Sequence, residues 1–176
     1  EHFPFVSRLW FGEYFEYNLD PDYWMTEVSG IPFGLTGEML EKGGRPYHGL
    51  VYGMTTRVYH NYNPGNIWKI FKDFNIQKSR MIGYWVDNSP IKVKNEKIRC
   101  TIYQKEKEVL ITIASWSEKD ELIKLVVDWD KIGFIKSEVR LISPRVSGLQ
   151  DFKVYEIDDK IEIKGNKGLV LKLTRD

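Results

Sequence analysis

The sequence contains one cysteine, three histidines and almost no net charge, and each shortage argues against a class of structure. Cys100 has no second cysteine with which to form an intramolecular disulfide, so we expect a small buried side chain there. The formal net charge of +1 gives no electrostatic reason to expect nucleic acid or an anionic membrane as a partner. His2, His48 and His60 have no metal-ligand spacing with one another or with Cys100. We therefore predict no metal site and no cofactor.

Three further patterns are missing from the chain. No apolar run is long enough to span a membrane. Gly43-Gly44 lacks the following Lys-Ser/Thr of a phosphate-binding loop, and Ser115 and Ser117 lack the nucleophile-elbow pattern. The chain also begins abruptly, with Glu1-His-Phe-Pro in front of an apolar strand and without a signal peptide. We therefore expect a piece of a longer protein, and the missing signal says nothing about that parent.

Aromatic residues are the most informative part of an otherwise ordinary globular composition. Hydrophobic residues make up 42% and charged residues 29%, whereas six Trp, ten Tyr and nine Phe together reach 14%. These rings concentrate in the first half of the chain. Large aromatic side chains fill cores, and they also form platforms on which sugar rings stack. Both interpretations stay open, and most of the rings must belong to the core.

The stretch from Phe3 to Glu13 predicts a strand that ends by presenting a carboxylate. It is too apolar for a half-exposed strand and is typical of one buried on both faces, as in a parallel sheet or barrel. Gly12 allows a sharp turn, which leaves Glu13 at the carboxyl end of the strand. In a (β/α)8 barrel, this end of the strands carries the catalytic groups.

The rest of the first half predicts two helices and a second buried strand. Asp20 and Pro21 are a good N-cap and first residue for a short helix that Ser29-Gly30 would end. Residues 31–40 predict a tight buried segment, a short strand leading into a turn of helix. Residues 48–57 predict a buried strand. Apolar residues at helical spacing predict a helix from Ile67 to Phe74, capped by Asn63 or Asn66.

From Met81 onward the pattern changes to short alternating runs separated by turn residues. Such runs predict an antiparallel β-sandwich, with one helical turn near Asp128-Trp129. The predicted fold is therefore α+β: residues 1–80 form the last βα units of a (β/α)8 barrel, and residues 81–176 form the sandwich. The alternating runs are 98–102, 109–113, 122–127, 139–142, 152–157, 161–164 and 169–173.

Several motifs give the chain a family resemblance. It resembles the C-terminal part of the bacterial proteins grouped as glycoside hydrolase family 123-like, over nearly its whole length. Ala114-Ser-Trp116 and Asp128-Trp129 also look like the ends of many barrel glycosidases. The motifs that carry the family resemblance are Leu9-Trp-Phe-Gly-Glu13, Pro21-Asp-Tyr-Trp24, Ser29-Gly-Ile-Pro-Phe-Gly34, Gly37-Glu-Met-Leu40, Tyr52-Gly-Met-Thr55, Ile67-Trp-Lys69 and Met81-Ile-Gly-Tyr-Trp85.

The resemblance implies a parent glycosidase that hydrolyses glycosidic bonds in a polysaccharide or glycan. Most of its barrel would lie upstream of Glu1, so this chain alone would be inactive. Its partners would be the carbohydrate substrate and the upstream barrel portion of the same protein. We expect a secreted or periplasmic parent.

Glycoside hydrolysis usually needs two carboxyl groups, and two glutamates are candidates. Glu13 is the first, because surrounding rings would raise its pKa and keep a general acid protonated. The alternative is a structural carboxylate that bonds a loop amide. Glu38, flanked by apolar residues, is the second; a buried pair with Arg57 is its alternative.

The loop after Glu13 is aromatic and acidic, as expected for a sugar subsite. Tyr23 and Trp24 have a competing interpretation, in which they pack the helix onto the barrel. Glu16 and Asp20 are further candidates for contact with sugar hydroxyls, although Asp20 is also explained as a helix cap. The candidate substrate-binding residues are Trp10, Tyr14, Tyr17, Asp22, Trp24 and Arg57.

Two alternatives place no catalysis in this chain. In the first it is a non-catalytic carbohydrate-binding module, which predicts an exposed line of aromatic residues formed by Tyr103, Trp116 and Tyr155. In the second the sandwich is a structural accessory module that only supports the barrel and never touches ligand.

Overall fold

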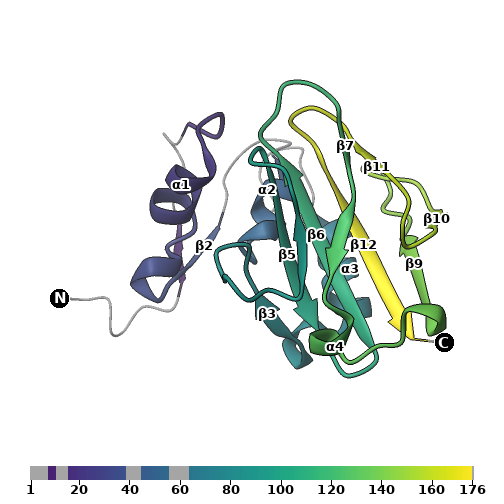
Figure 1. Ribbon diagram of the computed structural model, residues 1–176. Coiled ribbons are helices and arrows are strands. Elements are labelled where there is room, and N and C mark those ends of the chain that lie inside the picture. Colours follow the sequence, from purple (N-terminus) through teal and green to yellow (C-terminus); the bar gives the residue numbers. More distant parts are fainter. Residues whose placement is uncertain (1–7, 11–15, 39–44, 56–63, 176) are drawn as a thin grey trace.

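The computed structural model describes residues 8–10, 16–38, 45–55 and 64–175 of the chain. A small N-terminal part lies beside a larger antiparallel sheet (Figure 1). The elements of the N-terminal part are β1 (Arg8–Trp10), α1 (Pro21–Tyr23), the π-helical turn η2 (Trp24–Val28), the 3-10 turn η3 (Ile31–Phe33) and β2 (Thr36–Glu38).

The N-terminal part is a βαβ unit. β1 pairs with β2 in parallel, with Trp10 opposite Glu38, and the chain between them forms α1 and η2. This connectivity is the repeating unit of α/β barrels. Two parallel strands close no barrel within the described ranges, so the barrel end stays a prediction.

Gly37 allows the helical turn η2 to approach the strand β2. Its N–H donates a hydrogen bond of 2.8 Å to the carbonyl of Ser29. A Cβ at this position would lie 2.2 Å from the carbonyl oxygen of Val28, which is closer than any side chain permits. Helix-to-strand packing in the βαβ unit therefore requires glycine here.

The predicted helix after Asp20 is confirmed, including its cap. The Asp20 carboxylate accepts hydrogen bonds of 2.9 Å from the N–H groups of Asp22 and Tyr23, and Pro21 takes the first helical position. The short strand predicted within residues 31–40 is β2, whereas residues 39–40, where the predicted turn of helix would follow it, lie outside the described residues. The helical turn η3 comes first and the strand β2 second, because Gly30 and Gly34 adopt left-handed φ values of 69° and 71° on either side of η3.

The strand predicted at residues 48–57 was wrong, because α2 (Pro46–Val51) is a helix. Pro46 begins it at a position that proline favours. Residues 47–51 are all buried, so the sequence has no polar face that would mark a helical period. A short apolar run of this kind does not distinguish a buried helix from a buried strand.

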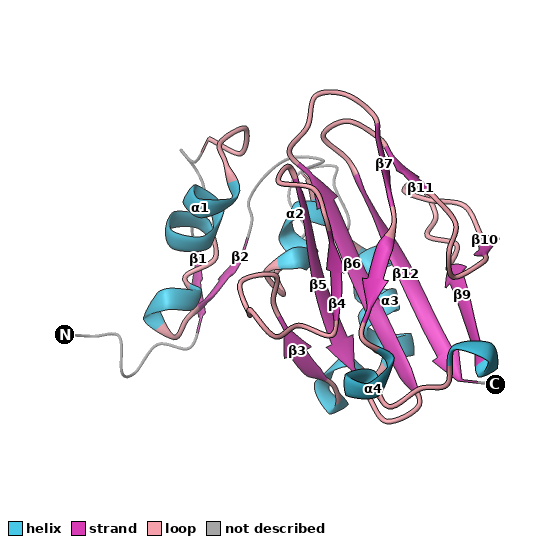
Figure 2. Cartoon of the chain, in the orientation of Figure 1, coloured by secondary structure: helices cyan, strands magenta, loops and turns pink. Residues whose placement is uncertain are grey.

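The larger part of the molecule is built on a six-stranded antiparallel sheet (Figure 2). The strands follow one another across the sheet in the order β10-β9-β12-β6-β5-β3. They are β3 (Arg80–Ile82), β5 (Ile98–Gln104), β6 (Glu108–Ser115), β9 (Val139–Ser143), β10 (Lys153–Tyr155) and β12 (Gly168–Arg175).

Two antiparallel ribbons cover one face of this sheet. The first pairs β4 (Ile91–Val93) with β8 (Leu125–Val127), and the second pairs β7 (Glu121–Ile123) with β11 (Ile161–Ile163). The helical turns α4 (Trp129–Ile132) and η5 (Lys136–Glu138) follow β8, and α4 confirms the helical turn predicted near Asp128-Trp129. The α+β class and the antiparallel strands are thus confirmed, but the expected second sheet consists of two separate ribbons.

Strict alternation along the strands produces two cores. Ile98, Cys100 and Ile102 of β5 contribute to a core with the ribbons, and Cys100 is buried as expected. Tyr103, the next residue along, contributes to a second core on the opposite face. Helices α2 and α3 cover that face (Figure 1). One face of the sheet is therefore sandwich-like and the other is covered by helices.

The predicted helix of the first half is α3 (Gly65–Phe74), followed by the 3-10 turn η4 (Ile76–Lys78). Pro64 occupies the N-cap, so the proposed cap Asn66 was wrong; its side-chain amide instead donates 2.6 Å to the carbonyl of Ser147. Asn63 lies outside the described residues. Asn75 ends the helix with a left-handed φ of 56°.

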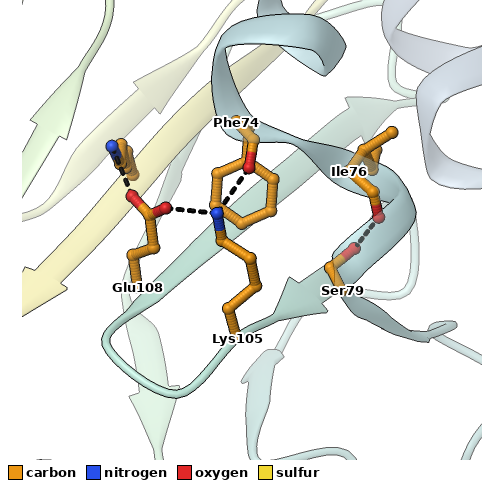
Figure 3. Close-up of polar contacts among 6 residues, drawn as sticks. Phe74, Ile76, Ser79, Lys105 and Glu108 are labelled. Atoms are coloured by element: carbon orange, nitrogen blue, oxygen red, sulfur yellow. Dashed lines mark hydrogen bonds and ion pairs between the residues drawn. The ribbon is translucent and has the colours of Figure 1, made fainter.

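A lysine fastens the end of α3 to the sheet (Figure 3). The ammonium group of Lys105 donates 2.5 Å to the carbonyl of Phe74 and lies 4.3 Å from the centre of its ring. Glu108 pairs with Lys105 and, at 2.5 Å, with Lys172. This half-buried network joins α3, the β5–β6 hairpin and β12.

Candidate functional site

The parallel strands β1 and β2 end at the same edge, and two of the predicted site residues end them. Trp10 is the last residue of β1 and Glu38 is the last residue of β2, and they are partners in the register. Glu13, Tyr14 and Arg57 lie outside the described residues. The backbone pairing thus places Trp10 and Glu38 side by side at one edge. Barrel enzymes carry their catalytic groups at this end of their strands.

The described part of the loop that leads from β1 to α1 contacts side chains from later in the chain. Asp22, in the first turn of α1, is exposed to solvent, as expected of a residue that could contact a sugar hydroxyl. Tyr17 is buried, with 9% of its surface exposed, and its ring meets the Trp24 ring edge-on at 5.5 Å. Trp24 has no exposed surface. This burial favours the packing interpretation of Trp24.

Side chains from outside the βαβ unit hold this loop by its carbonyl groups. The hydroxyls of Tyr52 and Tyr84 donate to the carbonyl of Pro21 at 2.8 and 3.3 Å. The indole N–H of Trp116 donates 3.0 Å to the carbonyl of Leu19. Three donors therefore fix the backbone immediately before and at the start of α1.

Burial raises the pKa of both tyrosines, and most strongly that of Tyr52. The two hydroxyls also lie 3.3 Å from each other. They consequently stay protonated across the physiological range and act as hydrogen-bond donors.

An aromatic cluster surrounds these contacts. Trp24 stacks on Tyr52 with ring centres 6.0 Å apart, and Tyr52 stacks on Trp85 at 6.1 Å. Trp116 meets the imidazole of His48 edge-on at 4.3 Å. We define the aromatic cluster as Tyr17, Trp24, His48, Tyr52, Tyr84, Trp85 and Trp116.

His48 lies inside this cluster as a neutral imidazole. It has no exposed surface, and burial, reinforced by the charges of Arg45 and Lys167, lowers its pKa to about 3. Neither ring nitrogen has a hydrogen-bond partner in the described part of the chain, nor does the indole nitrogen of Trp24. With its charge suppressed by burial, His48 packs within the aromatic cluster as a neutral ring.

The exposed aromatic line expected for a binding module was wrong. Tyr103 is 3% exposed, and its hydroxyl donates 2.7 Å to the carbonyl of Leu50. Tyr155 packs against the core on the other face of the sheet, with Lys153 4.5 Å from its ring centre. Trp116 belongs to the aromatic cluster. Tyr103 and Trp116 pack into the helix-covered core and Tyr155 packs into the other, so the three rings form no common exposed line.

Sequence reasoning missed the residues that hold the loop, although their motifs carried the family resemblance. Tyr52 lies in Tyr52-Gly-Met-Thr55, and Tyr84 lies in Met81-Ile-Gly-Tyr-Trp85. Their common feature is a hydroxyl aimed at one carbonyl, which depends on tertiary structure. Within the described ranges, no group of three or more His, Cys, Asp or Glu residues could hold a metal ion. None of the helices described there is long and apolar enough to cross a bilayer.

Comparison with known families divides the chain in two. Residues 1–59 match the TIM-barrel domain of glycoside hydrolase 123, and residues 63–174 match the C-terminal domain of glycoside hydrolase 123. No curated protein is similar enough in sequence to count as a match. The first match contains the βαβ unit and α2, and the second contains the six-stranded sheet with its ribbons.

Proposed function

Because the chain belongs to the glycoside hydrolase 123 family, we propose that it is part of an enzyme that hydrolyses glycosidic bonds in a polysaccharide or glycan. The observation that carries this proposal is the parallel pairing of β1 with β2 within the range that matches the TIM-barrel domain. Barrel enzymes carry their catalytic groups at the carboxyl ends of their strands. The proposed sugar site lies at that edge.

Two glutamates carry the proposed chemistry. Glu13, which follows β1 in the sequence, is the general acid that protonates the leaving-group oxygen. Glu38, at the end of β2, is the second carboxylate, which acts as base or nucleophile or orients a group of the substrate. Trp10 and Tyr14 stack against sugar rings. A pair of carboxyl groups is the usual requirement of glycoside hydrolysis.

The remaining candidate residues divide into two groups. Asp22 is exposed at the start of α1, and with Arg57 it is proposed to bond sugar hydroxyls. Tyr17 and Trp24 are buried in the aromatic cluster, so their proposed contribution is to support the loop.

We propose that residues 1–80 complete a barrel whose other strands lie in the upstream portion of the same protein. The chain 1–176 alone is then inactive, because a barrel site draws catalytic residues from several strands. Residues 81–176 form the accessory domain. A secreted or periplasmic parent fits a polysaccharide substrate that is too large to enter a cell, and cell fractionation of the parent tests this location.

The accessory domain has a proposed task of its own, which is to fix the loop between β1 and α1. Tyr84 and Trp116 of this domain hydrogen-bond the carbonyls of Pro21 and Leu19, which lie on that loop and at the start of α1. A fixed loop keeps the sugar-binding groups in position, and small displacements of such groups are costly for catalysis.

The test is hydrolysis of an aryl glycoside by the full-length parent and three variants. Glu13→Gln and Glu38→Gln should each lower kcat/KM by about 10² to 10⁴, the usual contribution of a general acid or base. Glu27→Gln, an exposed carboxylate on η2, is the matched control and should leave kcat/KM unchanged. Full activity in both Glu13→Gln and Glu38→Gln would remove this edge from the mechanism.

A further inference from the structure

A cavity of about 420 Å³ lies between α3 and the segment that follows β9, on the helix-covered side of the sheet. Its size suits a small ligand or part of an oligosaccharide. Apolar side chains provide most of the walls, which suits the C–H face of a sugar ring. The apolar lining comes from Ile70, Phe74, Leu110, Ile142, Pro144 and Val146.

The polar lining of this cavity carries an excess of positive charge. Lys69, Arg145 and Lys172 line it together with one acidic residue, Asp73. Lys69 pairs with Asp73 at 2.5 Å, and Lys172 pairs with Glu108 outside the cavity lining. Arg145 is exposed and has no hydrogen-bond or ion-pair partner among the described residues. A guanidinium group without a partner at the rim of an apolar hollow favours a carboxylate or sulfate.

An exposed tryptophan lies on the neighbouring surface of α3. Trp68 has 43% of its surface exposed, and its indole N–H donates 3.1 Å to the hydroxyl of Thr55, which fixes the ring. It lines a shallow hollow of about 390 Å³ that shares Lys69 and Asp73 with the cavity. A fixed, exposed ring therefore adjoins a positively charged, apolar-walled cavity.

We propose that this surface of α3 binds an acidic oligosaccharide, one whose sugar rings bear carboxylate or sulfate groups. One ring stacks on Trp68, and the next enters the cavity with its acidic group against Arg145. The site is separate from the edge of β1 and β2, so it holds substrate without cleaving it. The choice of carbohydrate as ligand rests on the proposed glycosidase function, whereas the position and the charge preference rest on the cavity itself.

The first test is calorimetric titration of the chain 1–176 with three tetrasaccharides. One consists of uronic acids, one carries sulfate groups, and one is neutral with the same linkage as the first. We expect at least one acidic tetrasaccharide to bind about tenfold more tightly than the neutral one, and the affinity to fall as salt is raised. Which acidic probe binds identifies the acidic group. Equal affinity for all three, or no binding of either acidic probe, would overturn the proposal.

Four variants locate the bound sugar. Trp68→Ala and Arg145→Gln should each weaken binding of the acidic tetrasaccharide by about tenfold, because one removes the stacking ring and the other a charge-assisted hydrogen bond. The matched controls are Trp85→Ala, an exposed tryptophan of the aromatic cluster, and Arg80→Gln, an exposed arginine on β3. Losses in the controls as large as those in the test variants would contradict this site.

The outcome is independent of catalysis. Binding is measured on a chain that performs no hydrolysis, and Glu38→Gln should leave the affinity for the tetrasaccharide unchanged. An inactive Glu38→Gln parent together with absent binding on α3 would reject this proposal alone. The reverse result would reject the proposed catalytic edge and leave the α3 site intact.

Discussion

The six-stranded sheet and the βαβ unit obtain their cores in different ways. The core between the sheet and its ribbons consists entirely of residues from the range 82–173. Trp24 and Val28, buried residues of the βαβ unit, belong instead to a core that they share with Leu50, Leu110 and Val170 of the larger part. The sheet and its ribbons are thus stabilised by a core of their own. The βαβ unit is stabilised only by a core that it shares with the larger part.

This difference matters for function because the dependent part carries the proposed catalytic edge. The loop before α1 is fixed by donors from outside the βαβ unit, namely Tyr52, Tyr84 and Trp116. We call the contact between this loop and its three donors the junction. Changes at the junction should loosen the βαβ unit while the sheet remains folded. Four measurements test that separation, in order of decreasing effect.

The largest effect is expected for Trp24→Ala. Removing this fully buried ring should cost the βαβ unit about 3–5 kcal/mol, through lost burial and the cavity left behind. In hydrogen exchange, amides of α1 and η2 should lose protection while those of β5 and β6 keep theirs. Trp68→Ala, the same change at a site that is 43% exposed, should cost only about 1 kcal/mol, mainly through the lost hydrogen bond to Thr55. Equal loss of protection in η2 and β6 would show that the two parts unfold as one.

Gly37→Ala should push the helical turn η2 away from the strand β2. The added Cβ meets the Val28 carbonyl at 2.2 Å, so overpacking should cost about 1–3 kcal/mol. Gly34→Ala is the matched control: a Cβ there meets nothing within 4 Å, and only its left-handed φ of 71° adds a cost of about 1 kcal/mol. Urea unfolding of both variants, followed by tryptophan fluorescence, gives the comparison. A larger loss in Gly34→Ala would contradict this account of η2 packing.

The free energy of unfolding should also fall in mild acid, because His48 is buried without charge beside the junction. Its pKa falls from 6.5 in the unfolded chain to about 3 in the folded one, so the unfolded state binds more protons in this window. Stability is therefore complete above pH 6.5 and should fall by up to about 1.4 kcal/mol per pH unit below it. His48→Phe should abolish this dependence, which thermal unfolding between pH 7.5 and 5 measures. An unchanged slope in the variant would assign the effect to other groups.

The smallest effect is expected for Tyr84→Phe in the full-length parent. Loss of one hydrogen bond to the Pro21 carbonyl is worth about 1 kcal/mol, which should lower kcat about fivefold if the loop borders the site. KM should change little, and the thermal midpoint should fall by no more than about 2–4 °C. Tyr155→Phe, remote from the junction, is the control and should match the unchanged enzyme. A fall in thermal midpoint without a fall in kcat would make Tyr84 merely structural.

The sequence predicted those parts of the fold that local rules control. Alternation identified β5, β6, β9 and β12, because one residue in two faces each core. The cap formed by Asp20 and Pro21 is a contact between neighbours, so α1 could also be predicted. Helix α2 could not, because a helix buried on every side has no polar stripe to reveal its period.

The site was harder to predict than the fold, for a physical reason. Glu38 could be named because it is a carboxylate flanked by apolar residues, and Trp10 because it is one of the rings next to Glu13 in the sequence. Their pairing in the parallel register came only from the structure. The shared role of the donors that hold the loop could not be predicted, because Tyr52 and Trp116 are far apart in sequence and meet only after the sheet has formed. Exposure was misjudged for the same reason: Tyr103 and Tyr155 alternate like surface residues but lie against two different cores.

The central claim is that the carboxyl edge of β1 and β2 borders the sugar site, and photoaffinity labelling tests it most directly. The full-length parent would be irradiated with a glycoside bearing a photoreactive group next to its scissile bond, with and without excess substrate, and the labelled peptides sequenced. We expect substrate-protected label on peptides spanning residues 8–22 or 36–45 of this chain. Protected label confined to the sheet, or to regions outside this chain, would contradict it.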